Sequence, residues 1–317
     1  MKNVEKSKNP PKKMKFGKSV KRFWPFYVML APGIIYLIIN NYIPMLGLVI
    51  AFKKIDYRLG ILKSPWVGLS NFEYLFKTSD AWVITRNTIG YNLIFIALGT
   101  VVAITVAILL NEIKGIRNKE TYQTLVLIPY LISTVVVSYL VYAFLSTDSG
   151  FINNSILANL GVDTISWYTE KKYWPVILVI VYLWKSFGYS SIIYYATVIG
   201  IDGSLYEAAV VDGANRWHKI KDIILPSLKG TIITLTLMSV GRIFYSDFGL
   251  FYQVPMNSGP LLDVTNTIDT YVYRGLLQLN DVGRASAAGF YQSMVGFIVV
   301  LAANLLVRKI DKENALF

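Results

Sequence analysis

Cysteine is absent from this 317-residue sequence, and histidine occurs only once, as His218. Without thiols the chain can form no disulfide, cysteine nucleophile or cysteine-based metal site, and its redox compartment cannot be inferred. A single histidine does not supply the usual ligand set of a zinc site. The sequence also contains no histidine-rich stretch and no Ser/His/Asp pattern. We therefore expect no catalytic residues, no metal site and no cofactor bound by this chain.

Charged residues are scarce, at 16% of the chain, whereas 54% of the residues are hydrophobic. The apolar residues form long blocks, which is typical of membrane proteins. A bilayer core about 30 Å thick needs roughly 20 apolar residues for each helical span. Six blocks meet that length, so the sequence predicts an all-α integral membrane protein with six transmembrane helices, at about 26–52, 88–110, 122–145, 174–199, 231–251 and 287–307.

The net charge of +12 is distributed in a way that indicates membrane topology rather than nucleic-acid binding. If the N-terminus is cytoplasmic, 19 of the 31 Lys and Arg residues lie in inside segments and 10 in outside segments. Positive residues orient short loops toward the cytoplasm. The sequence therefore predicts a plasma-membrane protein with both termini cytoplasmic. We expect a basic N-terminal arm at 1–22, a single membrane domain at 23–310 and a short tail at 311–317; the arm either lies on anionic lipid or serves only to set the topology.

The inside loop between the fourth and fifth blocks (200–230) has the local signals of two short helices. Ser204 and Glu207 have the spacing of a capping box, in which each side chain satisfies a backbone amide at a helix start. Gly213 stands where a left-handed turn would end that helix. A second helix is expected at 215–224. A helical hairpin with an apolar face at the membrane surface has a shape suited to docking.

The same loop carries a family resemblance. The spacing of seven of its residues matches, without a gap, the EAA signature of binding-protein-dependent ABC importer permeases. The neighbouring Asp212 and the 67–72 stretch Val-Gly-Leu-Ser-Asn-Phe resemble the carbohydrate branch, and most of all the permeases for oligosaccharides and polysaccharide fragments. The matching residues are Glu207, Ala208, Ala209, Gly213, Ile223, Leu225 and Pro226.

This resemblance implies that the loop docks on a separate ATPase. Glu207 would meet a basic residue of the ATPase, Ala208 and Ala209 would permit close approach, and Gly213 would supply the bend. Glu207 also has the capping-box explanation, and the two roles are compatible. The implied partners are a second permease subunit, giving a heterodimer, two copies of the cytoplasmic ATPase and an extracellular solute-binding protein.

ATP and magnesium are expected on the partner ATPase. The chain's own Gly17-Lys18-Ser19 lacks the glycine that a phosphate-binding loop requires five residues earlier, where Lys12 stands.

Charged residues inside the predicted spans are candidates for the solute path, because burying a charge in a bilayer is costly unless it faces a cavity or a partner. Lys185 lies in the fourth block, and Arg242 and Asp247 lie in the fifth. Interhelical ion pairs are an equally good explanation. If these three charges line the path, their net charge of +1 favours an acidic solute such as a uronate-containing oligosaccharide. In the resembled branch, however, neutral oligosaccharides are the more common solutes. Further candidates are the aromatic residues Trp184, Tyr189 and Tyr245, which are suited to stacking on sugar rings or to ordinary packing.

Two other function classes remain open from the residues. A permease for amino acids, peptides or phosphate would share the EAA signature. A secondary transporter or channel would share the six spans and the buried charges, but it would have no need of an ATPase-docking loop.

Overall fold

The computed structural model describes residues 16–310, so the predicted tail at 311–317 and most of the basic arm lie outside the described residues. The described part is helical, apart from an isolated bridge between Lys53 and Trp66. The chain divides into two compact units, one ending at Val49 and the other beginning at Ile50. This confirms the predicted all-helical class.

The first unit is one long helical stretch. Helix α1 (Phe16–Leu37) starts inside the predicted arm and continues through a π-type turn (Ile38–Tyr42), α2 (Ile43–Met45) and a 3-10 turn (Leu46–Phe52) whose end belongs to the second unit. The stretch from Lys21 to Phe52 is long and apolar enough to cross a membrane. It covers the first predicted block.

The second unit contains four more helices of spanning length. Helix α8 (Trp174–Ile199) matches its predicted block, whereas α5 (Asp80–Glu112) and α14 (Val282–Ile310) extend beyond theirs. The fourth runs from Arg216 through α11 (Leu225–Val240). The described chain therefore has five candidate spans, and a bent pair of helices raises the number to six if it counts as one.

That bent pair is α6 (Ile116–Leu131) and α7 (Thr134–Leu145), which meet at 89°. The span predicted at 122–145 is therefore not one continuous helix but a pair of helices with a sharp bend between them. Pro129 near the end of α6 weakens the helix there. Ser133 then starts a new helix, because its Oγ accepts a hydrogen bond from the Val136 amide at 3.3 Å.

The fifth predicted span, at 231–251, is also interrupted. Helix α11 ends at Val240, residues 241–247 form turns and extended backbone, and a short π-helix follows at Gly249–Gln253. The two longest connections that the predicted topology places outside, at 53–87 and 252–286, contain short helices. These are α3 (Gly60–Lys63), α4 (Ser70–Lys77), α12 (Leu262–Thr265) and α13 (Ile268–Leu277).

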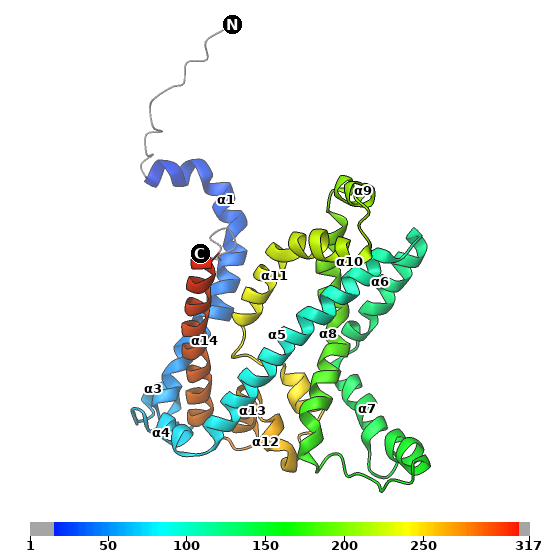
Figure 1. The fold of residues 1–317 in the computed structure, drawn as a ribbon. Coiled ribbons are helices and arrows are strands. Elements are labelled where there is room, and N and C mark those ends of the chain that lie inside the picture. The colour runs from blue at the N-terminus through cyan, green and yellow to red at the C-terminus, as the bar shows by residue number, and fades with distance from the viewer. Residues whose placement is uncertain (1–15, 311–317) are drawn as a thin grey trace. The chain divides into compact units, whose positions relative to one another are not determined.

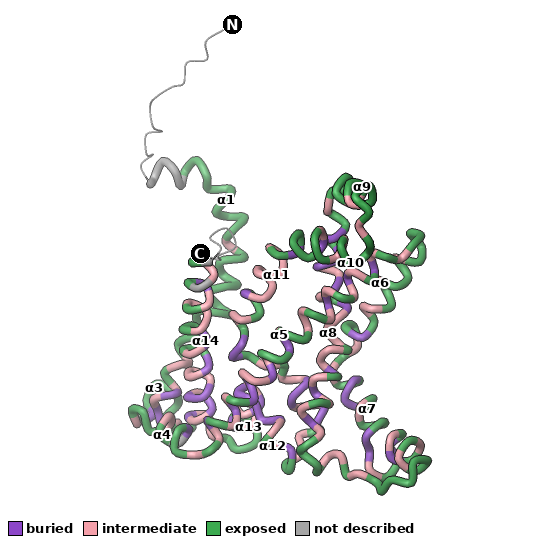
Figure 2. Tube along the Cα trace, viewed as in Figure 1, coloured by how far each residue is buried: buried purple, intermediate pink, exposed green. Residues whose placement is uncertain are grey.

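Helices α5, α6 and α8 form the packed centre of the second unit (Figure 1). Ala103 and Ala107 on α5 are fully buried beside Tyr194 and Val198 on α8. Gly188 on α8 lets α6 come so close that an added Cβ would lie 1.7 Å from the Val126 carbonyl oxygen. Small residues permit such close helix approach in membranes, so this contact fixes α6 against α8. Buried residues recur along α5 and α8, whereas the buried residue of α6 is Pro129. Figure 2 shows the helix α9 (Gly203–Val211) largely exposed at one end.

Candidate functional site

Helix α9 is the first helix of the predicted docking hairpin, and Asp202 caps its start. The Asp202 carboxylate accepts a hydrogen bond from the Ser204 amide at 2.9 Å, which holds the pKa of this carboxyl below its usual value. The predicted capping box of Ser204 and Glu207 is therefore wrong. Both Asp and Ser are good caps, and a carboxylate gains further from the helix dipole. Glu207 has no part in starting this helix.

The end of α9 confirms the predicted stop at Gly213. This glycine has φ +75°, the Ala214 amide bonds the Ala209 carbonyl at 2.8 Å, and the Gly213 amide bonds the Val210 carbonyl at 3.1 Å. This is a Schellman turn, whose left-handed residue is most often glycine. A Cβ added here would meet no atom within 4 Å, so the turn depends on backbone conformation rather than on space.

The second helix of the hairpin differs from the prediction. Asn215 caps it by accepting from the His218 amide at 3.0 Å. Helix α10 (Arg216–His218) then runs through a π-type turn (Lys219–Ile224) directly into α11. Pro226 falls in the first turn of α11. The wider π-type turn before it allows the helix to continue through the proline without a break. The predicted helix at 215–224 is therefore the beginning of the fifth span.

One side of this hairpin is fixed to the bundle. Ile224 and Leu228 are buried against Leu110 and Tyr194, and Tyr206 and Ile220 pack on the same cluster. Burial raises the pKa of the Tyr206 hydroxyl, which finds no hydrogen-bond partner within residues 16–310. The hairpin is thus held in one orientation.

The other side carries the predicted coupling residues. Glu207 is exposed, and no hydrogen bond or ion pair engages its side chain within the described range. Exposed apolar side chains of Leu205, Val210 and Val211 accompany it on α9. Of the remaining predicted residues, Ala208, Asp212, Gly213, Leu225 and Pro226 are exposed, while Ala209 and Ile223 are half-buried.

Lys185 closes the break between α6 and α7. Its Nζ donates to the carbonyl oxygens of Ile132 at 2.7 Å and Tyr130 at 3.2 Å, where the dipole of α6 favours a cation. Tyr189, one turn along α8, stacks on Tyr130 with ring centroids 4.8 Å apart. Lys185 thus satisfies backbone carbonyls instead of forming the ion pair considered from the sequence. Trp184 on the same helix is 40% exposed.

Arg242, Tyr245 and Asp247 lie in the interruption that follows α11, not in a helical span as predicted. The Asp247 carboxylate accepts from the Leu250 amide at 3.1 Å and so caps the next short helix. Tyr245 is 44% exposed. Arg242 is exposed, and no ion pair or side-chain hydrogen bond involves its guanidinium in the part of the chain that the structure describes. Lys185 and Asp247 thus bind backbone groups, whereas the Arg242 side chain has no such partner among the described residues.

Three polar side chains, which were not among the predicted site residues, form hydrogen bonds to the backbone of this non-helical stretch. Asn92 of α5 donates to the carbonyls of Ile243 at 2.8 Å and Tyr245 at 3.0 Å. Gln292 of α14 donates to the Phe244 carbonyl at 2.6 Å, and Asp269 of α13 accepts from the Ser246 amide at 2.7 Å. We call residues 241–247 the unwound segment.

The unwound segment lies well inside the helical bundle. Gln292 is ten residues beyond the start of α14, which at the helical rise corresponds to about 15 Å along its axis. Non-helical backbone at membrane depth needs partners from the protein, because lipid offers none. Asn and Gln inside apolar blocks were the sequence signal for this network.

Comparison with known proteins gives a consistent relationship. Residues 99–312 match the family model described as "Binding-protein-dependent transport system inner membrane component". The chain is 34% identical over 288 residues to the "Polygalacturonan/rhamnogalacturonan transport system permease protein YteP" of Bacillus subtilis (strain 168), covering 91% of this chain and 89% of that protein. It is 30% identical to "Protein LplB" of the same organism, covering 99% of each chain.

A crystal structure gives the same relationship in three dimensions. A bacterial ABC transporter involved in the import of the acidic polysaccharide alginate contains a chain with a TM-score of 0.85 and 33% sequence identity. The match covers 94% of this chain and all of that one. The family model spans more than half of the sequence, and the relatives cover nearly all of it. The chain therefore belongs to the binding-protein-dependent transport system inner membrane components, which are membrane-bound transport subunits.

Proposed function

We propose that this chain is the permease subunit of a carbohydrate ABC importer and that it carries acidic oligosaccharides. The similar proteins include a permease of a polygalacturonan/rhamnogalacturonan transport system and a chain of a transporter involved in alginate import, which supports the carbohydrate assignment. A solved relative stands in complex with a periplasmic protein that carries alginate pentasaccharide. The partners proposed here are a second permease subunit, two copies of a cytoplasmic ATPase, which bind ATP and magnesium, and an extracellular solute-binding protein.

The observation that carries this proposal is the docking hairpin at 200–230. Helix α9 has an exposed carboxylate, Glu207, without a structural partner in the described range, and exposed apolar residues beside it. The Gly213 turn and the packed Ile224 fix its direction. A short rigid helix of this kind suits insertion into a groove of another protein. Closure of two ATPases on each other would then move the two permease subunits.

The proposed topology has six spans, with α6 and α7 together forming the third, and both termini in the cytoplasm. The membrane domain extends over 23–310, with the basic arm at 1–22 and the tail at 311–317 on the inside. Helix α9 and helices α4 and α13 lie at opposite ends of the second unit (Figure 1), as this topology requires for an inside docking loop and outside connections.

Cysteine labelling tests this topology without background, because the chain has no cysteine of its own. We expect a membrane-impermeant maleimide to label Leu279→Cys, which is 74% exposed after α13, in intact cells. Val211→Cys, 87% exposed on α9, should be labelled only after the membrane is opened. The reverse labelling pattern would place the docking hairpin outside the cell and overturn the proposed coupling.

The preference for acidic solutes rests on Arg242. A guanidinium at membrane depth is costly unless it faces a water-filled cavity or a partner, and Arg242 has no ion pair within residues 16–310. Arg binds carboxylates through two parallel hydrogen bonds, so it is well suited to uronate groups. The unwound segment projects Arg242 together with the half-exposed Tyr245. A permease for neutral oligosaccharides, or for another solute class, is the alternative.

Uptake of matched acidic and neutral oligosaccharides by the assembled complex separates these alternatives. We expect Arg242→Met to reduce uptake of the acidic solute by about tenfold to a hundredfold and to leave neutral uptake unchanged, since a lost charge-assisted hydrogen bond is worth about 1.5–3 kcal/mol. Lys185→Met is the comparison variant. It removes a cation that binds the Tyr130 and Ile132 carbonyls, so it should lower both activities together with the amount of assembled complex. Equal loss of acidic and neutral uptake in Arg242→Met would remove the acidic-solute proposal.

A further inference from the structure

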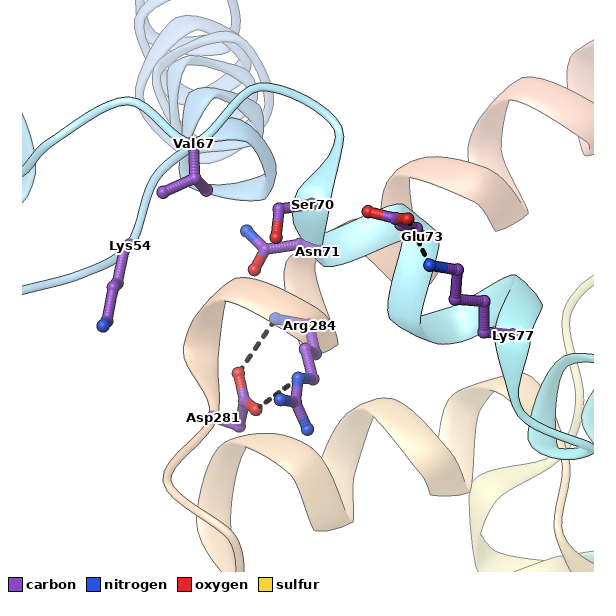
Figure 3. Close-up of a pocket in the computed structure, with 8 residues that line it drawn as sticks. All are labelled: Lys54, Val67, Ser70, Asn71, Glu73, Lys77, Asp281 and Arg284. Carbon is purple, nitrogen blue, oxygen red and sulfur yellow. Dashed lines mark hydrogen bonds and ion pairs between the residues drawn. The ribbon is translucent and has the colours of Figure 1, made fainter.

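A charged recess lies at the end of the second unit opposite α9, between the 54–77 segment and the first turn of α14. We call it the outer recess. Its volume is about 450 Å³. Figure 3 shows its lining side chains, which come from the extended segment, from α4 and from the start of α14: Lys54, Val67, Ser70, Asn71, Glu73, Lys77, Asp281 and Arg284.

The walls of the outer recess are rigid. Asn71 donates to the carbonyls of Ala51 at 2.9 Å and Lys53 at 3.1 Å, which ties α4 to the preceding segment. Gly283 in the first turn of α14 lies so close to Asn71 that an added Cβ would come within 2.9 Å of its Nδ2. The Phe72 ring packs edge-on against Phe290 of α14, with centroids 5.7 Å apart. A preformed recess of this kind can bind a partner group without being reordered.

Both acidic groups of the recess are already neutralised. Glu73 pairs with Lys77 at 2.5 Å, and this contact holds the pKa of the Glu73 carboxyl below its usual value, so the group stays ionised. Asp281 pairs with the Arg284 Nε at 3.0 Å and also accepts from the Arg284 amide at 3.1 Å. Three cations and two acids line the recess, which leaves a net charge of +1.

Lys54 is the source of the remaining charge. It is exposed, and its ammonium group has no hydrogen bond or ion pair in the described part of the chain. The adjacent Lys53 differs, because it is buried and donates to the carbonyls of Leu62 at 2.7 Å and Ile61 at 3.0 Å. One lysine of the pair thus supports the loop, while the other is available to an external anion.

We propose that the outer recess is a docking point for the solute-binding protein and that Lys54 pairs there with a carboxylate side chain of that protein. This inference rests on the proposed function, in which this end of the molecule faces outward. None of the lining residues that the structure describes is aromatic, so these residues offer no surface for stacking on a sugar ring. A preformed recess with a net positive charge, and with one lysine that has no partner in the described range, is suited to an acidic side chain of a protein, and such a contact fixes register and accelerates association.

Binding of the purified transporter complex to the solute-binding protein that copurifies with it from native membranes tests this proposal. We expect Lys54→Glu to raise the dissociation constant by about tenfold or more, because two like charges then meet. Lys54→Arg should bind as the wild type does. The matched control is Lys63→Glu, which makes the same charge change on an exposed lysine of α3 outside the recess and should also bind normally.

A charge exchange identifies the partner group. Replacing one surface carboxylate of the solute-binding protein by lysine should restore binding to the Lys54→Glu complex while weakening binding to the wild type. Unchanged affinity of the Lys54→Glu complex for the solute-binding protein would overturn the inference. If uptake also fell in that case, the recess would contact the solute instead. Failure of the proposed function would differ from both results, because the wild-type complex would then show neither binding nor uptake.

Discussion

Charge reversal in Glu207→Arg is expected to lower solute uptake by at least about thirtyfold, since breaking a desolvated charge pair between proteins costs about 2–5 kcal/mol or more. The variant should still reach the membrane in normal amounts. Asp202, not Glu207, caps α9, and the exposed Glu207 side chain makes no hydrogen bond or ion pair with the described residues. The change therefore leaves the helix intact while removing the proposed contact with the ATPase. Uptake, ATPase association and membrane content should be measured on the same preparation.

The control is Glu120→Arg, which reverses an exposed charge in the first turns of α6. The proposed topology places this position inside as well, in the connection that precedes the third span. The control variant should transport normally, because a general change in surface charge is not sufficient to uncouple the complex. Glu207→Gln keeps the shape and removes only the charge, so its uptake should fall between those of the wild type and Glu207→Arg. Normal uptake by Glu207→Arg would exclude Glu207 from coupling and leave the hairpin as a structural connection.

Features set by local chemistry were predictable from the sequence. The ends of α8 follow from an uninterrupted apolar block, and the turn at Gly213 follows from a glycine placed after the helical stretch. The prediction of where α9 starts was wrong, because two residues suited to capping a helix, Asp202 and Ser204, stand two positions apart and the local sequence does not distinguish them. The failure bears on the functional prediction, because it removes the structural explanation of Glu207 that stood beside its coupling role.

The two interruptions could not be predicted in the same way. The sequence around Ile132 is as apolar as a continuous span, so hydropathy does not distinguish this break from helix. Around Phe244, the charged Arg242 and Asp247 lower the hydropathy, but they do not show that the helix ends at Val240. What stabilises these interruptions is distant in the sequence, namely Lys185 for the first and Asn92 with Gln292 for the second. Polar residues in apolar blocks marked both places, but only the three-dimensional structure pairs each of them with the carbonyl groups that it satisfies.

The unwound segment is expected to lose its structure when Asn92 loses its amide. In Asn92→Leu, a substitution of similar size, the carbonyls of Ile243 and Tyr245 lose their donor. An unsatisfied buried polar group costs about 1–3 kcal/mol. Because the bond to Ile243 is partly buried and the bond to Tyr245 is exposed, the free energy of unfolding should fall by about 1–3 kcal/mol in total. Thermal unfolding of the purified complex measures this loss. Uptake should show a raised KM, because Arg242 and Tyr245 would no longer be held in one position.

Thr105→Val is the matched control on the same helix. Its hydroxyl bonds only to the Val101 carbonyl of α5, and the residue is exposed, so removing this group should change neither stability nor uptake appreciably. Asn92→Asp gives a stricter test, since it keeps the side-chain shape and exchanges the donor for a second acceptor that repels both carbonyls. If Asn92→Leu and Asn92→Asp both unfold at the wild-type temperature, Gln292 and Asp269 are sufficient to hold the unwound segment. If only uptake changes, Asn92 acts on the solute itself, and the interruption extends the binding surface from Arg242 to α5.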